Sequence, residues 1–196
     1  MRRPTKPVGI LIVVAVVVAT AWLASALSFV RQGYEPRQPI QFRHSRMAGP
    51  AVWQVNAKGE RTNVGGYDIP CLYCHTMPYK GRHSTVPSTA VCMNCHSTVG
   101  LGKEWVLKTK EYWDRGEPIP WVKVHDQPDF VYYDHSAHLT AKDAQGKLKL
   151  ECKDCHGEVE KRDVVRVETR FNMGWCVDCH RKPEMAASVD CIVCHR

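Results

Sequence analysis

The first 30 residues are apolar and differ in pattern from the rest of the chain. An uncharged stretch from Pro7 to Val30 follows three basic residues near the N-terminus. About 20 apolar residues are enough to cross the hydrocarbon core of a bilayer. Residues 1–30 are therefore predicted to form an N-terminal transmembrane anchor, with its basic flank in the cytoplasm and the rest of the chain outside. A cleaved signal peptide is the alternative, because Ala24-Ser-Ala26 would make an acceptable cleavage site.

In the polar part of the chain, residues 101–114 are the best helix candidate. Their apolar and aromatic positions recur at helical spacing and form one stripe. The stripe consists of Trp105, Val106, Thr109, Tyr112 and Trp113. The Gly-Glu-Pro-Ile-Pro run at 116–120 is expected to end this helix.

All ten cysteines belong to one repeated motif, Cys-x-x-Cys-His, which occurs five times. This motif is the attachment signature of c-type haem. Its two thiols add to the vinyl groups of the porphyrin, and its histidine becomes the proximal ligand of the iron. The sequence therefore predicts five covalently bound haem c groups. The attachment cysteines are Cys71, Cys74, Cys92, Cys95, Cys152, Cys155, Cys176, Cys179, Cys191 and Cys194, and the proximal ligands are His75, His96, His156, His180 and His195.

Two other chemistries use paired cysteines. Four-thiolate zinc sites consume Cys-x-x-Cys pairs two at a time, whereas the number of pairs here is odd. Disulfides within each motif are possible in an oxidising compartment. Neither zinc nor disulfides explain why a histidine follows every second cysteine, so haem attachment is the preferred interpretation.

Five further histidines provide candidate distal ligands, which would close each iron and suit it to electron transfer. They are His44, His83, His125, His135 and His138. From their positions, His44 is assigned to the haem at His75 and His83 to the haem at His96, with His125 and Met47 in reserve.

The segments 42–47 and 133–138 share one layout. Each places an aromatic residue two positions before a histidine and a second possible ligand three positions after it, namely Met47 or His138. Side chains at positions i and i+3 of a helical turn lie on the same face. One short turn can therefore serve two neighbouring haems.

Five porphyrins in residues 31–196 leave little room for a conventional core. The predicted fold class is a multihaem cytochrome c with low regular secondary structure, in which short helices and loops wrap around the haems, in addition to the N-terminal transmembrane helix. The predicted organisation is a two-haem module at 31–100, a connector with a helix at 101–130 and a three-haem module at 131–196. Aromatic side chains are expected to pack against the porphyrins.

The net charge of +7 does not by itself indicate a nucleic-acid partner. Each haem carries two propionates, and the charge of a cofactor belongs in the sum. The basic excess is expected to pair with these propionates, and no nucleic-acid binding is predicted.

The segment from Phe130 to His195 resembles the three-haem cytochromes of class III type, which also begin with an aromatic-x-His-x-x-His element. The resemblance implies that His135 serves the haem at His156 and that His138 serves the haem at His195. The middle haem of such a module takes its distal ligand from just before its own motif, where Met173 stands. A His/Met pair would raise the potential of that haem; simple packing against the porphyrin is the alternative role for Met173.

Most of residues 38–180 resembles the pentahaem cytochrome c subunit of alternative complex III, a bacterial quinol:electron acceptor oxidoreductase. Four phrases carry the resemblance: Gln38-Pro-Ile-Gln-Phe-Arg-His44, Pro87-Ser-Thr-Ala-Val-Cys-Met-Asn-Cys-His96, Trp121-Val-Lys-Val-His125 running on to Tyr133-Asp-His135-Ser-Ala-His138, and Met173-Gly-Trp-Cys-Val-Asp-Cys-His180. The family usually has His-x-x-His in its first ligand turn. Here Met47 takes the second place, so that either Met47 binds iron or this position is not a ligand.

This resemblance implies an electron-transfer subunit of a respiratory or photosynthetic membrane complex, without a catalytic site of its own. The haem domain would lie on the periplasmic side of the bacterial cytoplasmic membrane. Its partners would be an iron–sulfur subunit, polytopic quinol-oxidising subunits and a monohaem cytochrome subunit. Electrons would leave to a periplasmic carrier or a terminal oxidase.

Two alternative functions remain. One is a self-contained, membrane-anchored multihaem quinol dehydrogenase, which would oxidise quinol at its own haem. The other is a multihaem reductase with an open haem site, which the ample supply of spare ligands makes less favoured.

Overall fold

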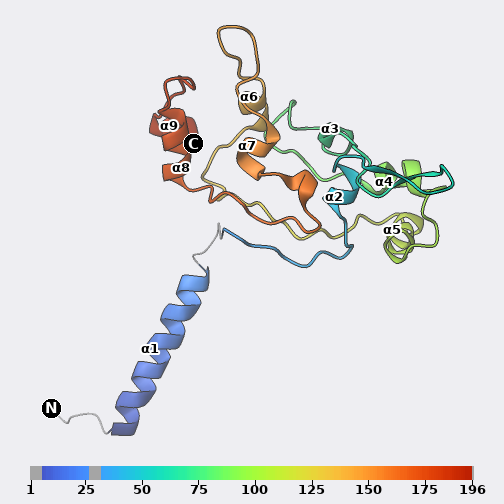
Figure 1. The fold of residues 1–196 in the computed structure, drawn as a ribbon. Coiled ribbons are helices and arrows are strands. Elements are labelled where there is room, and N and C mark those ends of the chain that lie inside the picture. Colours follow the sequence, from blue (N-terminus) through green and yellow to red (C-terminus); the bar gives the residue numbers. More distant parts are fainter. Residues whose placement is uncertain (1–5, 27–31, 196) are drawn as a thin grey trace.

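The computed structural model describes residues 6–26 and 32–195. Helix α1, Lys6–Ala26, is a single rod that carries the apolar segment (Figure 1). In the described part of the chain, no helix meets the length and apolarity that a membrane span requires. Residues 1–5 and 27–30, the two ends of the predicted anchor, lie outside the described residues.

Beyond α1 the described chain consists of short elements joined by long irregular segments, so the expected low content of regular structure is confirmed (Figure 1). Strands β1 and β2 pair antiparallel, with Trp53 opposite Asn63. The elements are α2 (His44–Met47), β1 (Trp53–Val55), β2 (Arg61–Asn63), α3 (Cys71–Cys74), α4 (Thr89–His96), α5 (Glu104–Asp114), α6 (His135–Leu139), α7 (Cys152–His156), the 3-10 turn η1 (Val159–Lys161), α8 (Met173–His180) and α9 (Cys191–Cys194).

Each Cys-x-x-Cys-His motif lies on a short helix, and local hydrogen bonds explain why. In α3 the backbone N–H of His75 donates to the carbonyl of Cys71 at 2.9 Å, which closes a single turn. Helix α8 begins where the side chain of Asn172 accepts a hydrogen bond from the N–H of Trp175 at 2.8 Å. Such caps satisfy the free N–H groups of a first turn. The two cysteines and the histidine thereby project from one turn.

The helix predicted at 101–114 is confirmed as α5, which begins three residues later, at Glu104. Gly100 has φ +72°, outside the helical region, and it starts a turn in which Lys103 N–H donates to Gly100 at 2.9 Å. Within the stripe, Val106 and Thr109 are buried. The helix ends before Gly116, whose φ of +66° favours glycine.

Segments far apart in the sequence lie side by side. The N–H of Gly33 donates to Val167 at 2.7 Å, and the N–H of Val167 donates to Tyr34 at 3.0 Å. The N–H of Ser45 donates to Arg162 at 2.8 Å, which joins α2 to the segment after α7. These contacts connect the predicted modules 31–100 and 131–196. The module boundaries stay a prediction.

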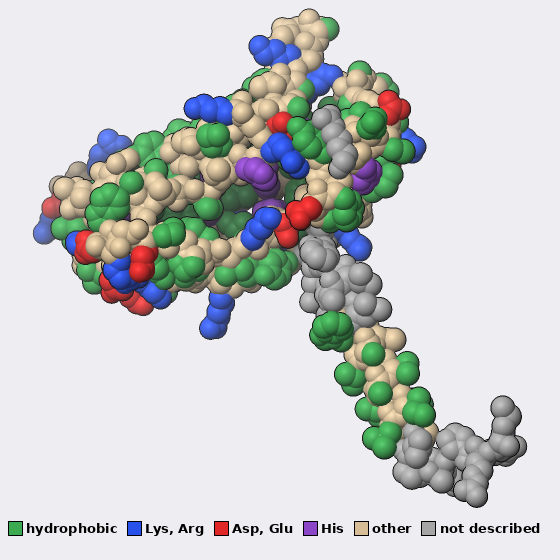
Figure 2. Space-filling model, turned by 180° about the vertical axis from the view of Figure 1, so that it is seen from behind, with side chains coloured by type: hydrophobic (Ala, Val, Ile, Leu, Met, Phe, Trp, Pro, Cys, Tyr) green, Lys and Arg blue, Asp and Glu red, His purple; other side chains and the backbone are tan. Residues whose placement is uncertain are grey.

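The interior contains few buried apolar side chains. Those less than a tenth exposed are Ile40, Met93, Val106, Ile119, Leu139 and Val167. Among the described residues no large side chain is fully buried. Figure 2 shows one face hollowed between its two sides, with hydrophobic side chains along the hollow and histidines at its edge. The polypeptide alone therefore forms an open frame, by which we mean a fold whose hydrophobic core contains few side chains.

Candidate functional site

Four of the five motif histidines are oriented in the same way. Each places its ring Nδ1 within hydrogen-bonding distance of a backbone carbonyl. A carbonyl can only accept, so the proton is on Nδ1 and the lone pair on Nε2 is free to bind a metal. The pairs are His75 with Thr85 at 2.7 Å, His96 with Val99 at 3.0 Å, His180 with Ser188 at 2.8 Å and His195 with Phe130 at 3.2 Å.

His156 is held differently. In the described residues its ring has no carbonyl partner, and it lies instead between two other imidazoles. The ring of His125 contacts it edge-on, with centroids 4.7 Å apart and an interplanar angle of 87°. Burial, together with the neighbouring His125, His135 and His75, lowers the pKa of His156 to about 4. The ring is therefore neutral at physiological pH, as a metal ligand must be.

His135 and His156 lie at a separation at which both could hold one iron between them. Their ring centroids are 6.3 Å apart and their planes differ by 6°. With metal–nitrogen bonds of about 2 Å, as in histidine-ligated zinc, two imidazoles on opposite sides of one metal place their centroids about 6 Å apart. The Nδ1 of His135 faces the carbonyl of Arg82 at 2.6 Å, so its Nε2 is free. The residues at this position fit a haem iron.

His138 lies next to His180, whereas the sequence assigned it to the haem at His195. The two rings have centroids 5.9 Å apart, with an interplanar angle of 35°. Nδ1 of His138 faces the carbonyl of Asp134 at 2.7 Å, which again leaves Nε2 free. The single turn of α6 thus presents two imidazoles to two different motifs. The assignment of His138 to the haem at His195 stays a prediction, and the ring contact makes the motif of His180 a second candidate.

The roles of Met173 and His195 as iron ligands stay predictions, and the structure gives their surroundings. Met173 begins α8 and is 66% exposed. The ring of His195 stacks on Phe130 with centroids 6.1 Å apart. Over the described ranges, no ring contact joins His195 to another histidine.

His44 opens α2 and lies near His75, the motif to which the sequence assigned it. Burial, aided by the neighbouring His75, lowers the pKa of His44 to about 4. Its Nδ1 is buried and has no hydrogen-bond partner. Met47, three residues after His44, is half-buried. His83 is exposed in the loop after α3, and among the described residues its ring contacts no motif histidine.

His125, kept in reserve by the sequence, is the second histidine with an unsatisfied nitrogen. Its Nε2 is buried without a hydrogen-bond partner, and burial lowers its pKa. A buried polar atom without a partner costs about 1–3 kcal/mol. Binding a metal would remove this cost, so His44 and His125 both fit a role beside a cofactor.

The motif cysteines form a continuous series in space. Burial raises the pKa of Cys152, and the neighbouring Cys71 adds to the effect, which places α7 beside α3. Burial also raises the pKa of Cys92, to which Cys74 adds, and that of Cys155, to which Asp154 and then Cys179 add. Cys194 lies close enough to Cys176 to raise its pKa further. The motifs therefore follow one another in the order α4, α3, α7, α8 and α9 (Figure 1).

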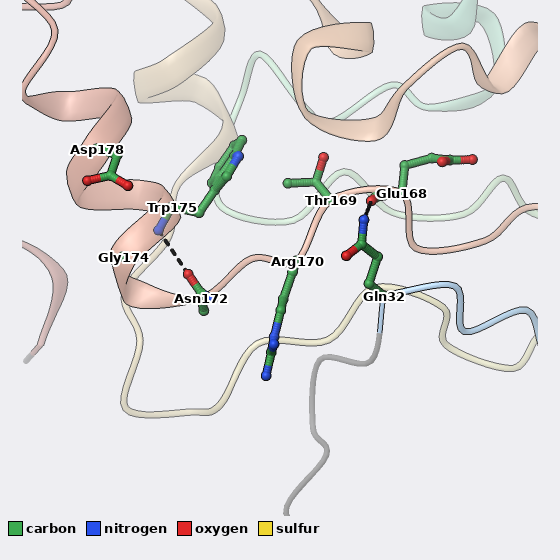
Figure 3. A pocket seen from close by; sticks show the side chains of 8 residues that line it. All are labelled: Gln32, Glu168, Thr169, Arg170, Asn172, Gly174, Trp175 and Asp178. Carbon is green, nitrogen blue, oxygen red and sulfur yellow. Dashed lines mark hydrogen bonds between the residues drawn. The ribbon is translucent and has the colours of Figure 1, made fainter.

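A hollow of about 570 Å³ lies between the first turns of α8 and the segment before it. Figure 3 shows Gly174, Trp175 and Asp178 of α8 along it, with Gln32 and Arg170 opposite. None of the cysteines or histidines of the motifs lines it. Trp175 precedes Cys176 and Asp178 lies between the two cysteines of the fourth motif, so the hollow lies beside that motif.

No protein-family model matches the sequence. The chain is 27% identical over 180 residues to the multiheme cytochrome c subunit of menaquinone reductase from Nitratidesulfovibrio vulgaris, strain Hildenborough. The matched region covers 83% of this chain and 78% of that protein. This similarity agrees with c-type haem attachment at the motifs.

Proposed function

We propose that this chain is a multihaem cytochrome c that relays electrons through five covalently bound haems within a quinone-linked membrane complex. The observation that supports it most is the pairing of His135 with His156, at the spacing two ligands of one iron require. The similarity to a multiheme subunit of a menaquinone reductase supports the same role. Haem iron bound in this way would take up and release single electrons.

The residues of the chain would arrange the cofactors as a line. The thiol of Cys152 lies beside that of Cys71, and Cys179 is one of the neighbours that raise the pKa of Cys155. Neighbouring attachment points therefore lie close together along α4, α3, α7, α8 and α9. In this proposal the haem at His96 is at one end of the line and the haem at His195 is at the other, and α3 joins α4 to α7.

The finer proposal is a place in alternative complex III or a similar assembly. Residues 1–30 would anchor the chain in the bacterial cytoplasmic membrane, with the haems on the periplasmic side. An iron–sulfur subunit, polytopic quinol-oxidising subunits and a monohaem cytochrome would be its partners, and a periplasmic carrier or terminal oxidase would receive the electrons. The resemblance of residues 38–180 supports this proposal.

The name of the similar subunit favours a second candidate, in which electrons run in the opposite direction and reduce a quinone. The same line of haems serves both directions, because each iron accepts and donates electrons. The residues of this chain do not set the direction; the potentials of the partners would.

One purification from native membranes in mild detergent would test these proposals. A pyridine haemochrome assay on this chain, after it has been separated from its partners under denaturing conditions, should find five covalently bound haems, and a smaller number would contradict the relay. Co-purification of polytopic subunits together with an iron–sulfur subunit would support a quinone-linked complex. Faster reduction of the haems by a menaquinol analogue than reoxidation by the quinone would favour quinol oxidation, and the reverse would favour quinone reduction. A lone pentahaem protein that still oxidises quinol would move the catalytic site into this chain.

A further inference from the structure

We propose that Arg82 is a positioning residue, which holds the His135 ring in place and thereby tunes the potential of the haem iron that His135 and His156 would share. This inference rests on the proposed function, because it concerns the same ligand pair. Arg82 lies in the loop between α3 and α4, far in the sequence from the histidine it would position.

Arg82 contacts the segment that leads into α6 through its side chain. Its Nε donates to the carbonyl of Tyr133 at 3.2 Å, and its Nη2 faces the carbonyl of Val131 at 3.5 Å. The guanidinium also lies 4.3 Å from the centroid of the Tyr132 ring, within the range of a cation–π contact. The planar fork of an arginine thus holds three consecutive residues just before the ligand helix.

The backbone of the same loop contacts the helix itself. The carbonyl of Arg82 accepts a hydrogen bond from Nδ1 of His135 at 2.6 Å. The carbonyl of Gly81 accepts one from the N–H of Ser136 at 3.3 Å. Side chain and backbone of one residue therefore fix both the entry into α6 and the rotation of its first imidazole.

Arg82 makes these contacts without a carboxylate. None of the ion pairs found over the described ranges includes it. Its bonds run to carbonyl oxygens, so its contribution is geometric and does not neutralise an acidic group. A lysine in place of Arg82 would keep the positive charge but would lose the planar guanidinium that contacts several groups at once.

The contact matters for potential because of what it does to the ligand. A hydrogen bond from Nδ1 fixes the tautomer and increases the basicity of Nε2, and a more basic ligand favours oxidised iron. His156, across from His135, has no carbonyl partner of its own over the described ranges. The electronic effect of the surroundings on this pair therefore comes mainly through His135 and the carbonyl of Arg82.

The test is a redox titration of the purified native complex carrying Arg82→Gln. We expect one of the five haems to become easier to reduce, with a threefold to tenfold higher ratio of reduced to oxidised form at a fixed potential, where tenfold corresponds to about 59 mV for one electron. The low-spin EPR signal of the same haem should shift, because its ligand ring rotates. Arg82→Lys keeps the positive charge and loses the planar fork, so it isolates the positioning effect and should shift the same haem in the same direction.

Arg115→Gln is the control, since Arg115 also places its guanidinium over a tyrosine, Tyr112, at 4.9 Å, and its ion pair is with Glu117, which is not a candidate ligand. The control should leave all potentials unchanged. Unchanged potentials and EPR signals in Arg82→Gln would overturn the proposal, even if the variant is less stable. If Arg82→Gln fails to assemble, Arg82→Lys decides by the same readouts. The haem count separates this test from the proposed function, because fewer than five haems in the wild type would contradict the relay itself.

Discussion

The two histidine turns, α2 and α6, have the same local geometry and are held by different parts of the chain. The ring centroids of Phe42 and His44 are 4.8 Å apart, with an interplanar angle of 81°. Those of Tyr133 and His135 are also 4.8 Å apart, with an angle of 82°. In both turns the serine after the histidine donates its hydroxyl to an aspartate. The repeated pattern therefore encodes a structural unit: an aromatic ring set edge-on to an imidazole at the start of a helical turn.

The two turns differ in where the aspartate that accepts from the serine lies in the sequence. Asp134 lies two residues before Ser136 and caps α6 through the N–H groups of Ser136 and Ala137. The partner of Ser45 is Asp163, 118 residues away, and α2 has no side-chain cap. The α6 turn is thus built from neighbouring residues, whereas α2 is completed only when a remote segment reaches it. The same arrangement of aromatic ring, imidazole and serine is therefore formed in α6 by nearby residues (local encoding) and in α2 with the help of a remote one (tertiary encoding).

Removing the histidine of each turn should have the largest effect. In His135→Ala the iron opposite His156 would lose a strong-field ligand, and one low-spin haem should become high-spin. His44→Ala should do the same at the motif of His75, which lies near His44. EPR of the oxidised protein would measure the change, with the haem count showing that attachment is intact. An entirely low-spin spectrum in either variant would remove that histidine from the ligand set.

Removing the aspartates should have a smaller effect, and it should differ between the turns. Asp134→Ala deletes a helix cap and should lower the free energy of unfolding by about 1 kcal/mol. Asp163 is about half exposed, and loss of its ion pair with Arg43 should cost less than about 1 kcal/mol. Urea unfolding would compare the two. Asp134→Asn, which keeps a capping oxygen, is the control and should restore most of the loss. Equal effects of the two alanine variants would contradict the distinction between local and tertiary encoding.

The smallest expected effect is a dependence of the stability of the fold on pH. The hydroxyl of Ser136 and backbone N–H groups hold the pKa of Asp134 below its usual range, and the hydroxyl of Ser45 and the guanidinium of Arg43 do the same for Asp163. Because each folded-state pKa is lower than the unfolded one, the stabilisation is fully present above about pH 4 and is lost as the pH falls through the folded-state pKa. Unfolding midpoints between pH 6 and 3 should therefore fall less steeply in Asp134→Asn than in the wild type. Parallel curves would contradict this.

The sequence predicts those features that short stretches of chain determine. The motif helices, the helix at Glu104–Asp114 and the likeness of the two histidine turns all follow from residues within a few positions of one another. The neighbour of His138 is different, since it depends on where α8 lies relative to α6. The same holds for Asp163, which reaches Ser45 only in the folded chain.

The functional residues that the sequence patterns do not reveal share one property, which is that only contacts in the folded chain distinguish them. Arg82 carries no motif, and its backbone carbonyl, which contacts His135, leaves no trace in residue identity. His125 was only a reserve ligand, although its buried, unsatisfied nitrogen distinguishes it in the structure.

The pairing of Gly33 and Tyr34 with Val167 has a consequence for how the protein is made. Synthesis runs from the N-terminus, so residues 33 and 34 leave the ribosome more than a hundred residues before their partner. A motif such as Cys71–His75 needs only its own turn to be complete, while this pairing must wait for most of the chain. Under the proposed function, haem attachment at Cys71–His75 would therefore not depend on the contacts of Val167 with Gly33 and Tyr34.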